Sequence, residues 1–163
     1  MILAGVDIGT LTCRLLIARL SESGRLTELH AERRILRLGE GVDESRRLSP
    51  AAIDRVLDTL RDWRAVIERY QVDGEVAVAT SAVRDAANRD TFIARIKQAA
   101  GFDVEVISGT DEARRTLLGL RSDLPPDVRG ILGVDIGGGS TEFIVDRRDG
   151  GRWCDQSTSG WFE

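Results

Sequence analysis

The pentapeptide Gly-Val-Asp-Ile-Gly occurs twice in this chain, at residues 5–9 and again at residues 133–137. Each copy ends a short apolar run, which is typical of a buried strand. The first copy continues as Thr-Leu-Thr and the second as Gly-Gly-Ser-Thr, so glycine and hydroxyl side chains follow both strands. The copies are too far apart for a solenoid repeat. We therefore interpret them as two edges of one site.

The composition indicates a globular protein and argues against several classes of partner. The chain has 163 residues, of which 42% are hydrophobic, and this is enough to build a core. No apolar run approaches the ~20 residues of a membrane helix, and the N-terminus lacks the basic region of a signal peptide. Cys13 and Cys154 are far apart and have no metal-binding spacing, so we expect reduced thiols in a cytoplasmic protein. With a net charge of -4 we expect neither nucleic acid nor membrane as a partner.

The order of predicted elements is typical of an α/β domain on a mixed sheet. Hairpin-connected strands come first, then a helix–strand–helix–strand–helix series, then the strand–turn–strand device again. Ser49 and Pro50 are a typical N-cap and first residue of a helix, whose apolar stripe includes Trp63. We expect Gly101 to end the second helix and Thr110 to cap the third. The predicted strands are 2–9, 13–20, 26–36, 75–80, 103–108, 131–137, 142–148 and 152–157, with a loop at 37–49 and a hairpin turn at 149–151.

Both repeated turns have the chemistry of a phosphate-binding loop. Glycine after a strand permits positive φ and a close approach of the backbone to a ligand. Successive amide groups in such a turn form a concave anion site, and hydroxyls at Thr10, Thr12, Ser140 and Thr141 add donors. We therefore expect each turn to hold a phosphoryl group.

A carboxylate stands two residues before the glycine of each turn, at Asp7 and Asp135. A carboxylate repels a phosphate unless a cation lies between them, so we expect Mg²⁺ or another divalent cation, held by carboxylates, water and phosphate oxygens. A dinucleotide fingerprint would have to open a helix, whereas an apolar stretch typical of a strand follows Thr141. The P-loop sequence is absent. Two ordinary hairpin turns remain the simplest alternative.

Five segments, in this order, resemble the exopolyphosphatase/guanosine pentaphosphate phosphatase (Ppx/GppA) family of the actin-like, sugar-kinase and Hsp70 superfamily. The segments are VDIGTLTCRLLIA, LRLGEGV, AVATSAVRDAANRDTF, VEVISGTDEARR and GVDIGGGSTEFI. The resemblance implies an actin-like ATPase (ribonuclease H-like) domain, with a mixed five-stranded sheet, antiparallel hairpins and flanking helices. It also implies a second actin-like domain. We expect residues 1–163 to form the first domain alone, because the printed sequence stops where the second should begin.

The resemblance also implies roles for individual residues. Glu112 matches the general base that orients the attacking water, and Glu142 matches a second acid of the site. Asp7 and Asp135 match the residues at the metal. The phosphate-binding positions match Gly9, Thr10, Thr12, Arg14, Arg84, Gly137, Gly138, Gly139, Ser140 and Thr141.

Simpler interpretations of these residues stay open. Acids in a first helical turn favour the helix dipole, which explains Glu112 and Asp111 without catalysis. Arg84 could form a surface ion pair with Asp85, and Glu142 could be a solvated strand residue. Leu11 stands where the family commonly has an amide, which removes one polar contact to phosphate. His30 has no metal or catalytic partner in the pattern and is interpreted as structural.

The resemblance predicts a hydrolase that releases terminal phosphate from inorganic polyphosphate, from guanosine pentaphosphate, or from both. A homodimer is the expected state of a full-length family member. Two alternatives remain: a non-catalytic domain that binds phosphate or nucleotide, and an ATP-binding kinase or ATPase domain of the same superfamily. The ATSAVRDAANRD segment favours the phosphatase.

Overall fold

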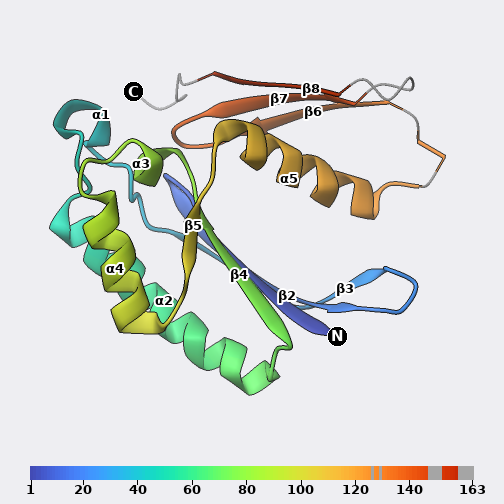
Figure 1. Cartoon of the computed structure of the whole chain (residues 1–163), viewed down its shortest axis with the longest axis horizontal. Helices are drawn as coiled ribbons and strands as arrows, with labels where there is room; N and C mark the ends of the chain where they lie inside the picture. The colour runs from blue at the N-terminus through green and yellow to red at the C-terminus, as the bar shows by residue number, and fades with distance from the viewer. Residues whose placement is uncertain (126, 129, 147–151, 158–163) are drawn as a thin grey trace.

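The chain folds around two separate sheets (Figure 1). The computed structural model describes residues 1–125, 127–128, 130–146 and 152–157, with the backbone alone at residue 123 and at 152–157. The larger sheet has the order β3-β2-β1-β4-β5, in which β1 pairs antiparallel with β2 and parallel with β4. This confirms the predicted mixed five-stranded sheet. Its strands are β1 (Ile2–Ile8), β2 (Thr12–Leu20), β3 (Leu26–Ile35), β4 (Gly74–Ala79) and β5 (Val104–Val106).

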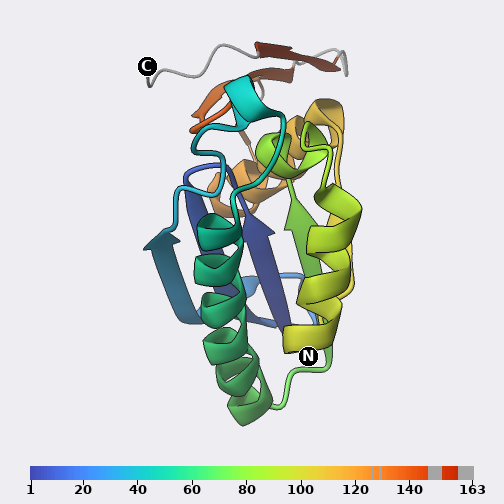
Figure 2. The same cartoon turned by 90° about the vertical axis from the view of Figure 1, so that its left-hand side faces the viewer.

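Two long helices, α2 (Pro50–Tyr70) and α4 (Arg89–Ala100), cover one face of the larger sheet (Figure 2). Ser49 caps α2 as predicted, since its hydroxyl accepts a hydrogen bond from the Ala52 amide. Trp63 is fully buried in the core between α2 and the sheet, and its indole N–H donates to Glu32. Gly101 ends α4 in a left-handed conformation, also as predicted.

The second sheet contains β6 (Ile131–Ile136), β7 (Thr141–Asp146) and β8 (Arg152–Ser157), and α5 (Gly109–Asp123) packs against it. Ala113 and Leu117 of α5 form a small apolar cluster with Ile144 that is separate from the main core. The repeated motif thus contributes one hairpin to each sheet. Whether residues 1–163 form the first family domain alone stays a prediction.

Several local predictions needed correction. Thr110 does not cap α5; the cap is Ser108, because its side chain one residue before the helix reaches the free Asp111 amide. The predicted loop at 37–49 contains one helical turn, α1 (Val42–Ser45), and a second short helix, α3 (Ser81–Arg84), follows β4. The turn at 149–151 lies outside the described residues.

His30 is half-buried, shares a hydrogen bond with Glu32 and lies against the Tyr70 ring, consistent with a structural role. Cys13 is a free, fully buried thiol, while the Cys154 side chain lies outside the described residues. Among the helices that the structure describes, none combines the length and the apolar character needed to cross a membrane.

Removal of the α5 cap should destabilise the helix that carries Glu112. The Ser108 hydroxyl accepts from the Asp111 amide at 3.1 Å and donates to the Asp111 carboxylate at 2.7 Å. We expect Ser108→Ala to lower the free energy of unfolding by about 1 kcal/mol, measured by urea denaturation. Ser108→Thr keeps the capping oxygen and should retain most of the stability. Equal stability of Ser108→Ala and the wild type would contradict this role.

Candidate active site

The two copies of the motif form hairpin turns with the same hydrogen bond. In the first, the Gly9 amide donates to the Thr12 carbonyl at 3.1 Å. In the second, the Gly137 amide donates to the Ser140 carbonyl at 2.9 Å. Each turn therefore spans four residues between paired strands, and corresponding positions of the two turns can be compared directly.

The tips of the two turns pack against each other. A Cβ atom on Gly138 would lie 2.6 Å from the Leu11 Cβ, and one on Gly139 would lie 2.7 Å from the Thr10 Oγ1. Close approach therefore requires glycine at both positions. Of the two properties that glycine offers at such a turn, positive φ and close approach of the backbone, the structure uses the second, because the glycines with positive φ are Gly24, Gly41, Gly101 and Gly130, all outside the two turns.

The segment after β3 holds the first turn in place through backbone hydrogen bonds. The Leu36 and Arg37 amides both donate to the Leu11 carbonyl, at 2.9 and 3.0 Å, and the Gly39 amide donates to the Thr10 carbonyl at 2.9 Å. Arg37 and Gly39 belong to the loop predicted at 37–49. It fixes the turn without lining the pocket.

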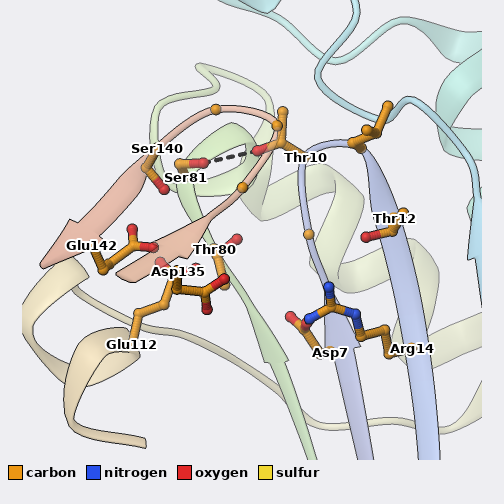
Figure 3. A pocket seen from close by; sticks show the side chains of 15 residues that line it. Asp7, Thr10, Thr12, Arg14, Thr80, Ser81, Glu112, Asp135, Ser140 and Glu142 are labelled. Carbon is orange, nitrogen blue, oxygen red and sulfur yellow. Dashed lines mark hydrogen bonds and ion pairs between the residues drawn. The ribbon is translucent and has the colours of Figure 1, made fainter. Parts of the chain in front are cut away.

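A single pocket lies between the two hairpins (Figure 3). It brings together every predicted site residue except Arg84 and Thr141, and adds three that were not predicted to contribute. Its lining consists of Asp7, Gly9, Thr10, Leu11, Thr12, Arg14, Thr80, Ser81, Glu112, Asp135, Gly137, Gly138, Gly139, Ser140 and Glu142.

Thr80 and Ser81 are the polar side chains that sequence reasoning missed. They follow β4, which pairs in parallel with β1, so both strands end at the same edge of the sheet. The Ser81 hydroxyl shares a 2.8 Å hydrogen bond with the Thr10 hydroxyl, drawn as a dashed line in Figure 3. The position of these two residues after a predicted strand could have indicated their role, because ligands of α/β sheets bind beyond the carboxyl ends of parallel strands.

The two hairpins differ in charge at matching positions. In the first, Asp7 pairs across the strands with Arg14, and the two side chains approach to 3.9 Å. In the second, Asp135 pairs with Glu142, so two carboxylates lie where the first hairpin has one carboxylate and one guanidinium. The hairpins therefore give the pocket one nearly neutral side and one strongly acidic side.

Glu112 enters the pocket from the first turn of α5. Burial raises the pKa of its carboxyl to about 7, with the negative charge of Glu142 as the next cause and Arg84 opposing the shift. Its Oε2 atom is buried and accepts no hydrogen bond from the residues that the structure describes. Near neutral pH this carboxyl can accept a proton, as a general base must.

Arg84 and Thr141 lie outside the pocket lining. The Arg84 guanidinium donates to the Ile107 carbonyl at 3.0 Å and lies 3.9 Å from Glu112 Oε2 and from Asp85. It therefore lies next to Glu112 but outside the pocket lining, and its role as a phosphate ligand stays a prediction. Thr141 is buried, and its hydroxyl forms no hydrogen bond within the described part of the chain.

The carboxylates of the pocket suit a divalent cation. Burial raises the pKa of Asp7, Arg14 opposes this, and the nearby charge of Asp135 raises it further. The two predicted metal ligands therefore lie close enough to repel each other, and a cation would relieve that repulsion. Among the described residues, no three His, Cys, Asp or Glu side chains form a ready-made metal cluster. Mg²⁺ does not need such a cluster, since it commonly takes one or two carboxylates and completes its coordination shell with water and phosphate oxygens.

Comparison with known proteins gives a consistent match. The model of the Ppx/GppA phosphatase family matches residues 16–150. Exopolyphosphatase 2 of Mycobacterium tuberculosis is 37% identical over 154 residues, covering 90% of this chain and 48% of that protein. A bifunctional 3-dehydroquinate synthase/phosphatase of Fusobacterium nucleatum is 36% identical over 154 residues, covering 90% of this chain and 23% of that protein.

Solved structures agree with the sequence matches. An exopolyphosphatase from Cytophaga hutchinsonii superposes with a TM-score of 0.89 at 33% identity, covering 98% of this chain and 51% of that one. A Ppx/GppA family member from Aquifex aeolicus gives a TM-score of 0.84 at 34% identity, covering 98% and 52%. These likenesses confirm the predicted actin-like fold. The chain spans about half the length, or less, of the relatives it matches.

Proposed function

Because the chain belongs to the Ppx/GppA phosphatase family, we propose that it carries the hydrolytic site of a phosphoanhydride hydrolase. Inorganic polyphosphate is the first substrate we assign, since relatives at 32–37% identity are named exopolyphosphatases. Guanosine pentaphosphate is the second. Both substrates present a terminal phosphoryl group on a chain of like groups, which suits two adjacent phosphate-binding turns.

One observation carries this proposal: the pocket between the two glycine turns also contains Glu112. Two turns alone would suffice for a binding site. A carboxyl with a pKa of about 7 in the same pocket adds a group that can take a proton from water. That combination supports hydrolysis over simple phosphate binding.

The proposed reaction is a direct displacement by water. Glu112 orients a water molecule and accepts one of its protons while the water oxygen attacks the terminal phosphorus. The bond from that phosphorus to its bridging oxygen breaks, and the bridging oxygen leaves with the electron pair. The turn amides, the hydroxyls of Thr10 and Ser140, and Arg14 hold the phosphoryl oxygens, so that catalysis is chiefly positioning and electrostatic stabilisation.

Asp7 and Asp135 are the residues that would hold a divalent cation. When bound, such a cation neutralises charge on the phosphoryl oxygens. Of the remaining acids of the pocket, Glu112 acts on the water, and the negative charge of Glu142 helps to raise the pKa of Glu112.

We expect the rate of phosphate release to rise with pH as Glu112 loses its proton, with a midpoint near its pKa of about 7. The direction follows because only the deprotonated carboxylate can accept a proton from water. Glu142→Gln removes the second cause of the raised pKa and should move the midpoint to lower pH. The measurement is kcat/KM between pH 5.5 and 9 at fixed Mg²⁺, with the range chosen to bracket an ordinary and a raised carboxyl pKa. A rate that falls through this range would contradict the assignment.

Phosphate release by this chain tests the proposal and separates the rivals. The substrates are polyphosphate, guanosine pentaphosphate and ATP, each at matched phosphate concentration with Mg²⁺. Release from polyphosphate or the pentaphosphate supports the hydrolase, and release from ATP alone favours an ATPase. Polyphosphate binding without release, measured by titration calorimetry, favours the non-catalytic binding domain.

A further inference from the structure

Thr116 lies one helical turn after Glu112 on α5, so both side chains lie on the same face of the helix. The Thr116 hydroxyl donates a hydrogen bond to Asp135 Oδ2 at 3.3 Å. Thr116 is half-buried and does not line the pocket. Its side-chain hydroxyl reaches the site through the carboxylate of Asp135.

The carboxylate of Asp135 lies near other negatively charged side chains. Its cross-strand partner is Glu142, and its charge is felt by both Asp7 and Glu112. Mutual repulsion favours rotation of such a carboxylate away from the others. Within the described part of the chain, Thr116 supplies the hydrogen bond that opposes this rotation. Occupying Oδ2 leaves the second oxygen of Asp135 available to the pocket.

We propose that Thr116 is a positioning residue that orients Asp135 to receive a divalent cation. The inference rests on the proposed function, because it concerns one of the two acids assigned there to the metal. Partners that orient ligating carboxylates typically contribute 10–100-fold in metal affinity. One rigid helix then sets both the position of Glu112 and, through Thr116, the orientation of Asp135.

The test measures cation binding directly, with Mn²⁺ as a paramagnetic probe. Thr116→Val keeps the branched shape of the side chain and removes the hydroxyl, whereas Thr116→Ser keeps the hydroxyl. Electron paramagnetic resonance titration should give about 10-fold weaker Mn²⁺ binding for Thr116→Val, and near wild-type binding for Thr116→Ser. Thermal unfolding without metal identifies any loss of folding in the Val variant.

A double-mutant cycle with Asp135→Asn distinguishes positioning from a general structural role. If Thr116 acts through Asp135, adding Thr116→Val to Asp135→Asn should not weaken Mn²⁺ binding further. An equal loss in both backgrounds, wild-type affinity in Thr116→Val, or no Mn²⁺ binding by the wild type would each overturn the inference. Failure of the proposed function is seen separately, as absence of phosphate release by a chain that still binds Mn²⁺.

Discussion

Glu112→Gln should lower the rate of phosphate release from polyphosphate by about 10²–10⁴-fold, the usual contribution of a positioned general base. Glutamine has nearly the same shape and still accepts a hydrogen bond, but it cannot take a proton from water. The side chain reaches the pocket from α5, and its Oε2 atom is buried without a hydrogen-bond partner among the described residues. We expect the loss mainly in kcat, with KM little changed, because the phosphate-binding turns remain intact.

The melting temperature of Glu112→Gln provides the control for its folding. Burial raises the folded-state pKa of Glu112 above its ordinary value, so folding favours the protonated form. The contribution of this group to stability is therefore present at low pH and lost as pH rises through about 7. Glutamine removes that loss, and metal-free Glu112→Gln should melt at a higher temperature than the wild type at pH 8.

Glu105→Gln is a matched acid-to-amide change outside the pocket. Glu105 is exposed and forms a surface ion pair with Arg115 on α5. Its replacement should leave phosphate release unchanged. Wild-type activity in Glu112→Gln would assign the base to another group, and an equal loss in both variants would point to a disturbed helix.

The sequence predicted those parts of the site whose chemistry is local. Both turns follow from residues adjacent in the chain: an apolar strand, glycine, then hydroxyl side chains. The start of α2 was predictable for the same reason, since Ser49 and the Ala52 amide are three residues apart. The repeated motif itself indicated that Asp7 and Asp135 belong to one site, whereas the role of Glu112 came from the family resemblance, because spacing alone cannot place a helix residue in that pocket.

The sequence did not predict the site residues that depend on contacts between distant segments of the chain. Ser81 enters the site through a hydrogen bond to Thr10, 71 residues away. Thr116 looks like any half-buried helix residue until α5 is placed against β6. The repeated motif also gave no indication that its copies belong to different sheets, because a strand ending in the same five residues can form a hairpin in either sheet.

The glycines of the second turn are required because the two turns approach each other closely. The sequence analysis named two properties of glycine, positive φ and close approach of the backbone, and the structure shows that limited space is the constraint. A Cβ at position 138 would meet the Leu11 side chain at 2.6 Å and the Leu11 backbone nitrogen at 3.1 Å. A change at this position therefore acts on the spacing between the two turns.

Gly138→Ala should lower phosphate release by about 10²-fold, because a displacement of about 1 Å between groups that position a reacting phosphate costs that much. The measurement is kcat/KM with polyphosphate. Gly5→Ala is the matched control, since Gly5 belongs to the first copy of the motif and an added Cβ there meets nothing within 4 Å. We expect that variant to retain wild-type activity.

A second substitution can show that the Leu11 contact causes the effect. Leu11→Gly removes the atom that an alanine at position 138 would approach most closely, so combining it with Gly138→Ala should restore part of the lost activity. Restoration would show that the two turns must meet at a fixed spacing for the phosphoryl groups to bind between them. If the double variant is as impaired as Gly138→Ala, the remaining contact with the Leu11 backbone dominates. If Gly138→Ala has full activity, the turns tolerate separation, and the shared pocket does not depend on their contact.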